Sequence, residues 1–274
     1  MKHKISNTLL TVLILIVLAS GVLLGLEITG YETRKYSVLK PENRINGIKI
    51  RSLVEKYKPI IYQPQSIRPN PVFIYYEVTT LGDNITITYY IVWPDEYHPN
   101  LLIDSLYRMF RILYFGSSTD IEFVKCILNR SSLDIIEVHF ETLVKNTLLE
   151  IPEHTLLILR NESGRYVKIC GEIKETLDFC PFANKHLILQ VISWNHLFNI
   201  TKHLRGREYD LPPKFLTDEE YKMYKMRRRF PTTIQRKKSL DIIIKLASSL
   251  LIFALLIRIK LHCHVLPLIK IHPY

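Results

Sequence analysis

The chain has 274 residues, 47% of them hydrophobic, and a formal net charge of +11. No acidic residue occurs before Glu27 or after Asp241, and 31 of the 37 basic residues lie between them, so more than half of the excess positive charge sits at the two ends. No basic patch with interleaved aromatic residues is found, which excludes nucleic acid as the expected partner. A glycine-rich phosphate loop, a GxSxG turn and an HExxH motif are also missing, which excludes the common nucleotide-binding and hydrolase signatures.

The first predicted element is a transmembrane helix over residues 8–26. These nineteen residues carry no charge and follow Lys2 and Lys4. At 1.5 Å per residue they are long enough to cross a hydrocarbon core of about 30 Å. A cleaved signal peptide is the alternative, but its apolar region is normally only about 7–15 residues long. Gly25-Leu26-Glu27 also makes a poor cleavage site, so we expect an uncleaved anchor.

Residues 27–70 are polar and dotted with prolines, and they predict a stalk that leads into a first strand at 58–64. Beyond them, seven short runs rich in Val, Ile, Tyr and Phe are separated by turns, which predicts a mainly β domain with a β-sandwich fold. The runs are 72–78, 85–93, 121–128, 133–141, 155–160, 166–173 and 186–192. Gly82-Asp83-Asn84 indicates a hairpin between the first two.

Two peripheral helices are predicted within this domain. Residues 101–114 have an apolar face of helical spacing. This face consists of Leu102, Leu106, Met109, Phe110 and Leu113. Residues 216–229 begin with Thr217 and Glu220, which have the spacing of a capping box, and end in three arginines that suit a helix C-terminus.

The last predicted element is a second transmembrane helix over residues 240–259. Its part 246–257 is apolar all round, which argues against a soluble amphipathic helix as the alternative, and basic residues flank both ends. Lys2 and Lys4 place the N-terminus in the cytoplasm, and two crossings return the C-terminus to the same side. We therefore expect a two-pass protein of the cell membrane with its main domain outside.

The expected organisation runs from one cytoplasmic end to the other. In order, it comprises a cytoplasmic N-terminus (1–7), a transmembrane helix (8–26), the stalk (27–70), the extracytoplasmic β-rich domain (71–230), a basic juxtamembrane linker (231–239), a transmembrane helix (240–259) and a cytoplasmic tail (260–274). All N-x-S/T sequons fall in the outer part, which makes them glycosylation candidates. They are Asn84, Asn129, Asn161 and Asn199.

The four cysteines are Cys126, Cys170, Cys180 and Cys263, and none forms a CxxC pair, which argues against a cysteine zinc site. Cys170 and Cys180 bracket a short polar loop and are candidates for a disulfide in an oxidising compartment. Two buried free thiols in strands are the alternative.

Acidic residues gather where two predicted strands end and begin. Asp120 and Glu122 project from one face of their strand, and Asp95 or Glu96 follows the strand 85–93, so these carboxylates can meet. Oxygen ligands of this kind suit Ca²⁺ or Mg²⁺. In the alternative, each acid pairs with a neighbouring cation. The candidate cations are Arg108, Arg111 and Lys125.

Residues 85–221 resemble the necrosis-inducing (Nep1-like) cytolysin family and its β-sandwich superfamily. The segments that carry the resemblance are "VWPDE" (92–96), "GSSTDIEFV" (116–124), "VISWNHL" (191–197) and "LPPKFLTDEEY" (211–221). The resemblance implies a divalent metal held by Asp95, Asp120 and Glu122. Ser117 stands where the family has a histidine, and His98 is the candidate substitute.

We expect a binding or structural module of the cell surface rather than an enzyme, with the lipid bilayer and a membrane protein as expected partners. One alternative is a membrane-tethered, metal-dependent hydrolase with Asp95, Asp120 and Glu122 on the metal and His98 or His139 as acid/base. Another is an accessory subunit of a membrane complex that packs through Ser248-Ser249. A large exposed apolar patch on the outer domain favours that version.

Overall fold

The computed structural model describes residues 34, 36–146 and 152–230. They fall into two units, a large one with residues 34–112 and 116–224 and a small one to which 113–115 and 225–230 belong. Both predicted transmembrane helices, 8–26 and 240–259, lie outside the described residues, as do the predicted cytoplasmic ends and Cys263. Among the helices that are described, none has the length and apolarity that a membrane crossing requires.

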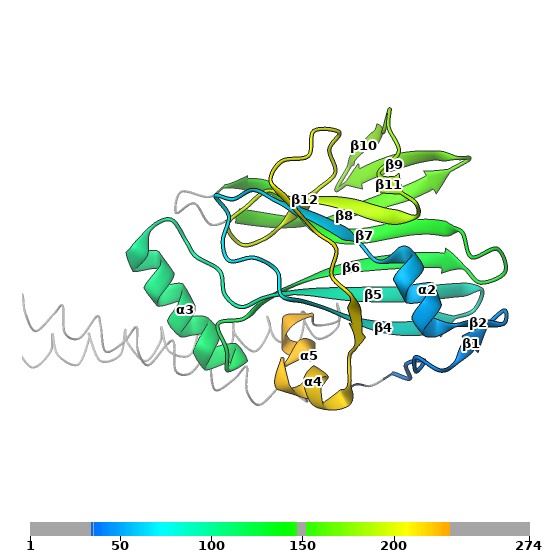
Figure 1. The fold of residues 1–274 in the computed structure, drawn as a ribbon. Coiled ribbons are helices and arrows are strands. Elements are labelled where there is room, and N and C mark those ends of the chain that lie inside the picture. Colours follow the sequence, from blue (N-terminus) through cyan, green and yellow to red (C-terminus); the bar gives the residue numbers. More distant parts are fainter. Residues whose placement is uncertain (1–33, 35, 147–151, 231–274) are drawn as a thin grey trace, which may run out of the picture. The chain divides into compact units, whose positions relative to one another are not determined.

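The large unit is built on an eight-stranded sheet with the order β10-β9-β8-β7-β6-β5-β4-β15 (Figure 1). Neighbouring strands are antiparallel, except that β15 runs parallel to β4 at one edge. The strands are β4 (Phe73–Leu81), β5 (Asn84–Trp93), β6 (Asp120–Asn129), β7 (Ile135–Asn146), β8 (Pro152–Glu162), β9 (Arg165–Cys170), β10 (Ile173–Thr176) and β15 (Pro213–Phe215).

A second, smaller sheet has the order β11-β12-β3-β14, and β13 also pairs with β12. Its central pair, β12 and β3, is parallel. The strands are β3 (Ile60–Gln63), β11 (Phe182–Ala183), β12 (His186–Val191), β13 (Phe198–Asn199) and β14 (Arg207–Tyr209). Two short strands, β1 (Arg44–Ile45) and β2 (Ile48–Lys49), form a separate hairpin.

The hydrophobic core lies between these layers and makes the large unit a β-sandwich. Alternate residues of β5, from Ile85 to Trp93, point into it, and Phe198 of the small sheet contacts Trp93 and Phe140 of the large one. Helix α2 (Ile50–Tyr57) packs against the core side of the large sheet. There the hydroxyl of Tyr89 donates to the carbonyl of Val54 over 2.8 Å. The predicted β-sandwich is confirmed.

All seven predicted strands are present, and the predicted hairpin closes where Leu81 pairs with Asn84. In the predicted stalk, β3 forms at the expected apolar patch, but α2 was not predicted. Its buried residues do have helical spacing. They are Ile50, Leu53, Val54 and Tyr57. Polar residues on the other face of the helix mask this pattern in the sequence.

The other helices are α3 (Leu101–Phe115), α4 (Asp218–Met223) and α5 (Met226–Arg229). The capping box of Thr217 and Glu220 is confirmed, but the single helix predicted over 216–229 is wrong. Lys225 adopts a left-handed φ of 49°, which ends one helix before the next begins.

The position of helix α3 in the chain was predicted correctly, but the exposure of its apolar face was not. Leu102 and Met109, two residues of the predicted apolar face, are exposed. The side chains of Leu106, Phe110 and Leu113 are not among those described.

Three of the four sequons, Asn84, Asn129 and Asn161, lie away from the predicted acidic residues. Asn84 pairs with Asn129, and the antiparallel order brings the β8–β9 hairpin with Asn161 to the same end of the large sheet. Trp93 and Asp120 mark the opposite end. Cys126, Cys170 and Cys180 are free cysteines, so the disulfide considered for Cys170 and Cys180 is not formed in this structure.

Candidate functional site: a buried acidic cluster

The site forms where β5 ends and β6 begins, because Trp93 and Asp120 are directly paired there. The chain between these strands carries the acids that follow β5, then α3, and returns through Gly116. This glycine has a left-handed φ of 75°, and its N–H donates to Ile112 at the end of the helix. Asn100 caps the start of the helix by accepting from two backbone N–H groups. These caps set where the helix begins and ends.

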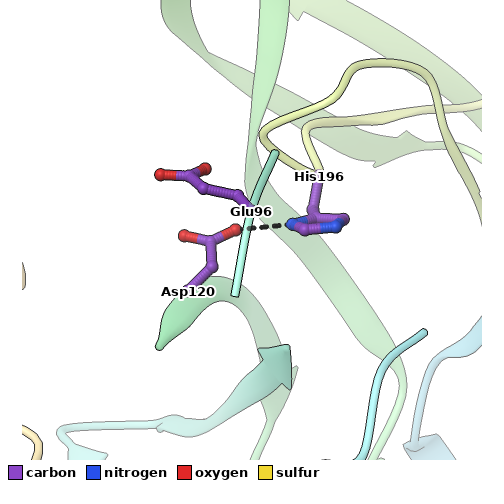
Figure 2. Close-up of side chains that lie close together, drawn as sticks. All are labelled: Glu96, Asp120 and His196. Atoms are coloured by element: carbon purple, nitrogen blue, oxygen red, sulfur yellow. Dashed lines mark hydrogen bonds and ion pairs between the residues drawn. The ribbon is translucent and has the colours of Figure 1, made fainter. Parts of the chain in front are cut away.

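Glu96, Asp120 and His196 form the centre of the site, and one potential ligand atom from each lies within 4.8 Å of the others. The three residues are 3%, 7% and 0% exposed. Figure 2 shows His196 directed at Asp120, with 2.7 Å between Nδ1 and Oδ2, and Glu96 alongside. Trp93 stacks on the imidazole with a centroid distance of 4.4 Å and an interplanar angle of 10°.

A tight turn after β12 delivers His196 to this position. Its backbone φ is +60°, and its N–H donates to the carbonyl of Ser193 over 3.0 Å. The Ser193 hydroxyl closes the turn by accepting from the N–H of Leu197 and donating to Asn195. A positive φ is uncommon for a histidine, so this hydrogen-bonded turn is what holds the ring against Asp120.

Arg111 of α3 enters the same cluster, and only 3% of its side chain is exposed. Its Nη1 lies 2.8 Å from Oε1 of Glu96 and 3.8 Å from Oδ1 of Asp95, and its Nη2 lies 3.7 Å from Oδ1 of Asp120. One guanidinium thus approaches three carboxylates from the helix side.

Arg108, one turn earlier, pairs with Asp95 and, over 3.4 Å, with Asp104. Burial alone would lower the pKa of Arg108, but the two carboxylates outweigh it and raise the pKa. Burial and then the charges of Glu96 and Asp120 raise the pKa of Tyr107, which therefore stays a neutral phenol beside the cluster.

The structure brings together only part of the predicted ligand set. Asp120 is in the cluster, and Asp95 borders it through Arg111 and through its own hydrogen bond from the N–H of Glu96. Glu122 is buried on the same face as Asp120 but pairs with Ile91, one alternate position further along β6. His98 instead accepts from the N–H of Asn100 and packs edge-on against Trp194.

The donor atoms are close enough together for a metal, but Arg111 changes the balance of charge. An ion about 2.0–2.6 Å from the carboxylate oxygens would lie within about 6 Å of the guanidinium. The repulsion between a divalent ion and that guanidinium is on the order of 5 kcal/mol at an effective dielectric constant of about 20. Arg111 therefore opposes the binding of a divalent cation by the residues present. They fit the alternative reading, in which the acids pair with Arg108 and Arg111.

His139, the second acid/base candidate, is on the other face of the large sheet. It pairs with Lys125, whereas its neighbour Phe140 points into the core with Val124. Its Nε2 lies 2.8 Å from a carboxylate oxygen of Glu137. His139 is therefore not part of the cluster around Asp120.

His196 was not among the predicted site residues, and Glu96 was predicted only as an alternative to Asp95. The one signal for His196 was its place in "VISWNHL", where Ser193, Asn195 and His196 interrupt an apolar run.

No protein-family model matches the chain, and no curated protein matches it. Among solved structures, Necrosis and Ethylene inducing Protein 2 from the causal agent of cocoa's witches' broom disease is 11% identical over 69% of this chain and 81% of that chain, with a TM-score of 0.35. A structure of the toxin fold for microbial attack and plant defense is 12% identical over 72% and 84%, with a TM-score of 0.37. The non-toxic HaNLP3 protein is 15% identical over 74% and 88%, with a TM-score of 0.34. These matches are to proteins of the kind that the sequence resembles.

Proposed function

We propose that this chain is a two-pass protein of the cell membrane that displays its β-sandwich outside as a binding module, and that α3 rests on the outer surface of the bilayer. The observation that carries the proposal is an apolar stripe on α3, which we call the α3 stripe. Its residues and their exposed fractions are Leu101 (82%), Leu102 (71%), Met109 (54%) and Ile112 (49%).

The members of the α3 stripe lie along one side of the helix as two apolar pairs, with the exposed Ser105 between them. At 100° per residue its members fall within an arc of about 100°, and at 1.5 Å per residue they extend over about 17 Å. Tyr97 is exposed just before the helix, and the guanidinium of Arg108 lies 5.1 Å from the centre of its ring. Grouped apolar side chains of this kind on a surface mark a contact site.

The bilayer is the favoured partner because the predicted anchors keep the domain close to it. Seven residues lie between the end of the first predicted anchor and Arg34, and nine lie between Phe230 and the start of the second, which makes eight and ten Cα–Cα steps. Fully extended, these linkers reach at most about 30 Å and 36 Å. Together the exposed fractions of the α3 stripe equal about two and a half complete side chains, and their burial is worth roughly 4–8 kcal/mol before the costs of association.

A tethered hydrolase has less support. Metal-assisted hydrolysis needs a coordination position open to water and substrate. Glu96, Asp120 and His196 are each less than a tenth exposed, and Arg111 faces them from α3.

Vesicle sedimentation with a soluble fragment, residues 27–239, tests the bilayer contact. We expect the fragment to bind phosphatidylcholine vesicles, and Leu102→Ser/Met109→Ser to weaken binding at least about 30-fold, since roughly 2 kcal/mol or more of apolar burial is lost. The matched control is Leu81→Ser/Ile173→Ser, an apolar pair on hairpins of the sandwich that is more exposed than the tested pair.

Equal losses in both double variants would contradict a specific role for the α3 stripe. No vesicle binding by the wild-type fragment would refute the bilayer contact and leave the stripe to a membrane protein, as in the accessory-subunit alternative.

A further inference from the structure

We propose that Arg111 is a built-in cation that takes the place of a divalent metal in the acidic cluster. While its guanidinium is present, the cluster holds α3 against the sandwich without Ca²⁺ or Mg²⁺. When its charge is removed, Glu96, Asp120 and His196 become a site for such an ion. This inference does not rest on the proposed membrane contact.

The charges within the cluster support this role. Glu96, Asp120 and Asp95 bring three carboxylates together, and Arg111 lies within 2.8–3.8 Å of an oxygen of each. Such a group of buried acids needs a counter-charge, because their mutual repulsion otherwise forces one of them to take up a proton. A planar guanidinium with several N–H donors can face more than one carboxylate at once.

The position of Arg111 on its helix directs the guanidinium toward the acidic cluster. Nine residues, or two and a half turns, separate it from Leu102, so the helix turns Arg111 toward the sandwich and Leu102 away from it. Both ends of the helix are capped, by the side chain of Asn100 and by Gly116. The ion pair thus acts as a clamp between α3 and the paired ends of β5 and β6.

The remaining groups are suited to a metal once a substitution has removed the positive charge of Arg111. One ligand atom of each of Glu96, Asp120 and His196 already lies within 4.8 Å of the others. The Nδ1 of His196, 2.7 Å from Oδ2 of Asp120, is the ring nitrogen that faces the carboxylates. Carboxylate oxygens supply the hard ligands that Ca²⁺ and Mg²⁺ prefer.

Thermal melting of the full chain in a non-ionic detergent tests the proposal, with EDTA, CaCl₂ or MgCl₂ added. Arg111→Met removes the charge and keeps an apolar stem of similar length. The matched control is Arg108→Met, which alters an arginine of the same helix that pairs with Asp95 and Asp104.

We expect the wild-type midpoint to be the same in EDTA and in calcium. In EDTA, Arg111→Met should melt lower by on the order of 10 °C, and calcium should restore much of the loss in a saturable way. Arg108→Met should not respond to metal. The double variant Arg111→Met/Glu96→Gln, with one charge fewer on each side, should recover in EDTA without any metal.

A saturable rise of the wild-type midpoint in calcium or magnesium would overturn the proposal, because the ion would then bind with Arg111 in place. Failure of calcium to restore Arg111→Met, whether that variant is folded or unfolded in EDTA, would overturn it as well.

Discussion

Glu77 provides the sharpest stability prediction, because it fastens the chain next to the first predicted anchor onto the sandwich. Its buried carboxylate accepts from the hydroxyls of Tyr36 and Tyr90 over 2.7 Å and 2.8 Å. It also pairs over 3.4 Å with Nε of Arg34, whose side chain is 5% exposed. The predicted perturbation is Glu77→Gln, which keeps the shape and removes the charge.

The magnitude follows from what Arg34 loses. After the substitution its remaining ionic partner is Asp218, whose side chain is 79% exposed and well solvated. Removing one partner of a buried pair costs about 3–5 kcal/mol, because the other charge stays buried. We expect a fall of that size in the free energy of unfolding, measured by urea denaturation of the soluble fragment.

The control is Glu162→Gln, which breaks an exposed pair with Lys174 and should cost at most about 1 kcal/mol. Arg34→Met/Glu77→Gln should recover part of the loss, since it leaves no buried charge alone. A loss from Glu77→Gln no larger than that of the control would refute the reasoning.

Two further predictions concern titratable groups. Burial alone would raise the pKa of Glu137, but hydrogen bonds from His139 and Arg160 outweigh it and hold the pKa below its usual value. Such a group contributes stability above its unfolded pKa and loses it as the pH falls through the folded one. The free energy of unfolding should therefore fall below about pH 4.3, and it should fall less steeply in Glu137→Gln. Urea midpoints measured across pH check this, and parallel curves for the two proteins would contradict the prediction. Burial raises the pKa of the Cys126 thiol to about 12. The native chain is treated with iodoacetamide at pH 8 and analysed by mass spectrometry. We expect the exposed Cys180 to be alkylated and Cys126 to stay unmodified until denaturant is added. Equal labelling of the two thiols in the native state would be the contrary result.

The strands could be predicted from the sequence because side-chain alternation is a local property. From Ile85 to Trp93 every second residue is apolar and points into the core, and Gly82-Asp83 marks the turn before them. Helix α2 was missed because half of its pattern is polar. The exposure of α3 could not be predicted, since an apolar face has the same spacing whether it is buried or directed outward.

The acidic cluster could be predicted only in part. Asp95 and Asp120 mark the ends of neighbouring strands, so their closeness follows from the strand order, and Arg111 was already named as a pairing partner. His196 comes from a turn 76 residues after Asp120, and no local spacing predicts such a contact. Whether a metal or an arginine faces the acids depends on how α3 is rotated, which only the folded structure reveals.

Equilibrium dialysis of the full chain against radioactive calcium tests the central claim most directly. The wild-type protein, stripped with EDTA and held in a non-ionic detergent, should bind no calcium in a saturable way, whereas Arg111→Met should bind a single ion that magnesium competes for. Saturable binding of one calcium ion by the wild-type protein, lost in Asp120→Asn, would contradict the assignment of Arg111 as the cation of the cluster.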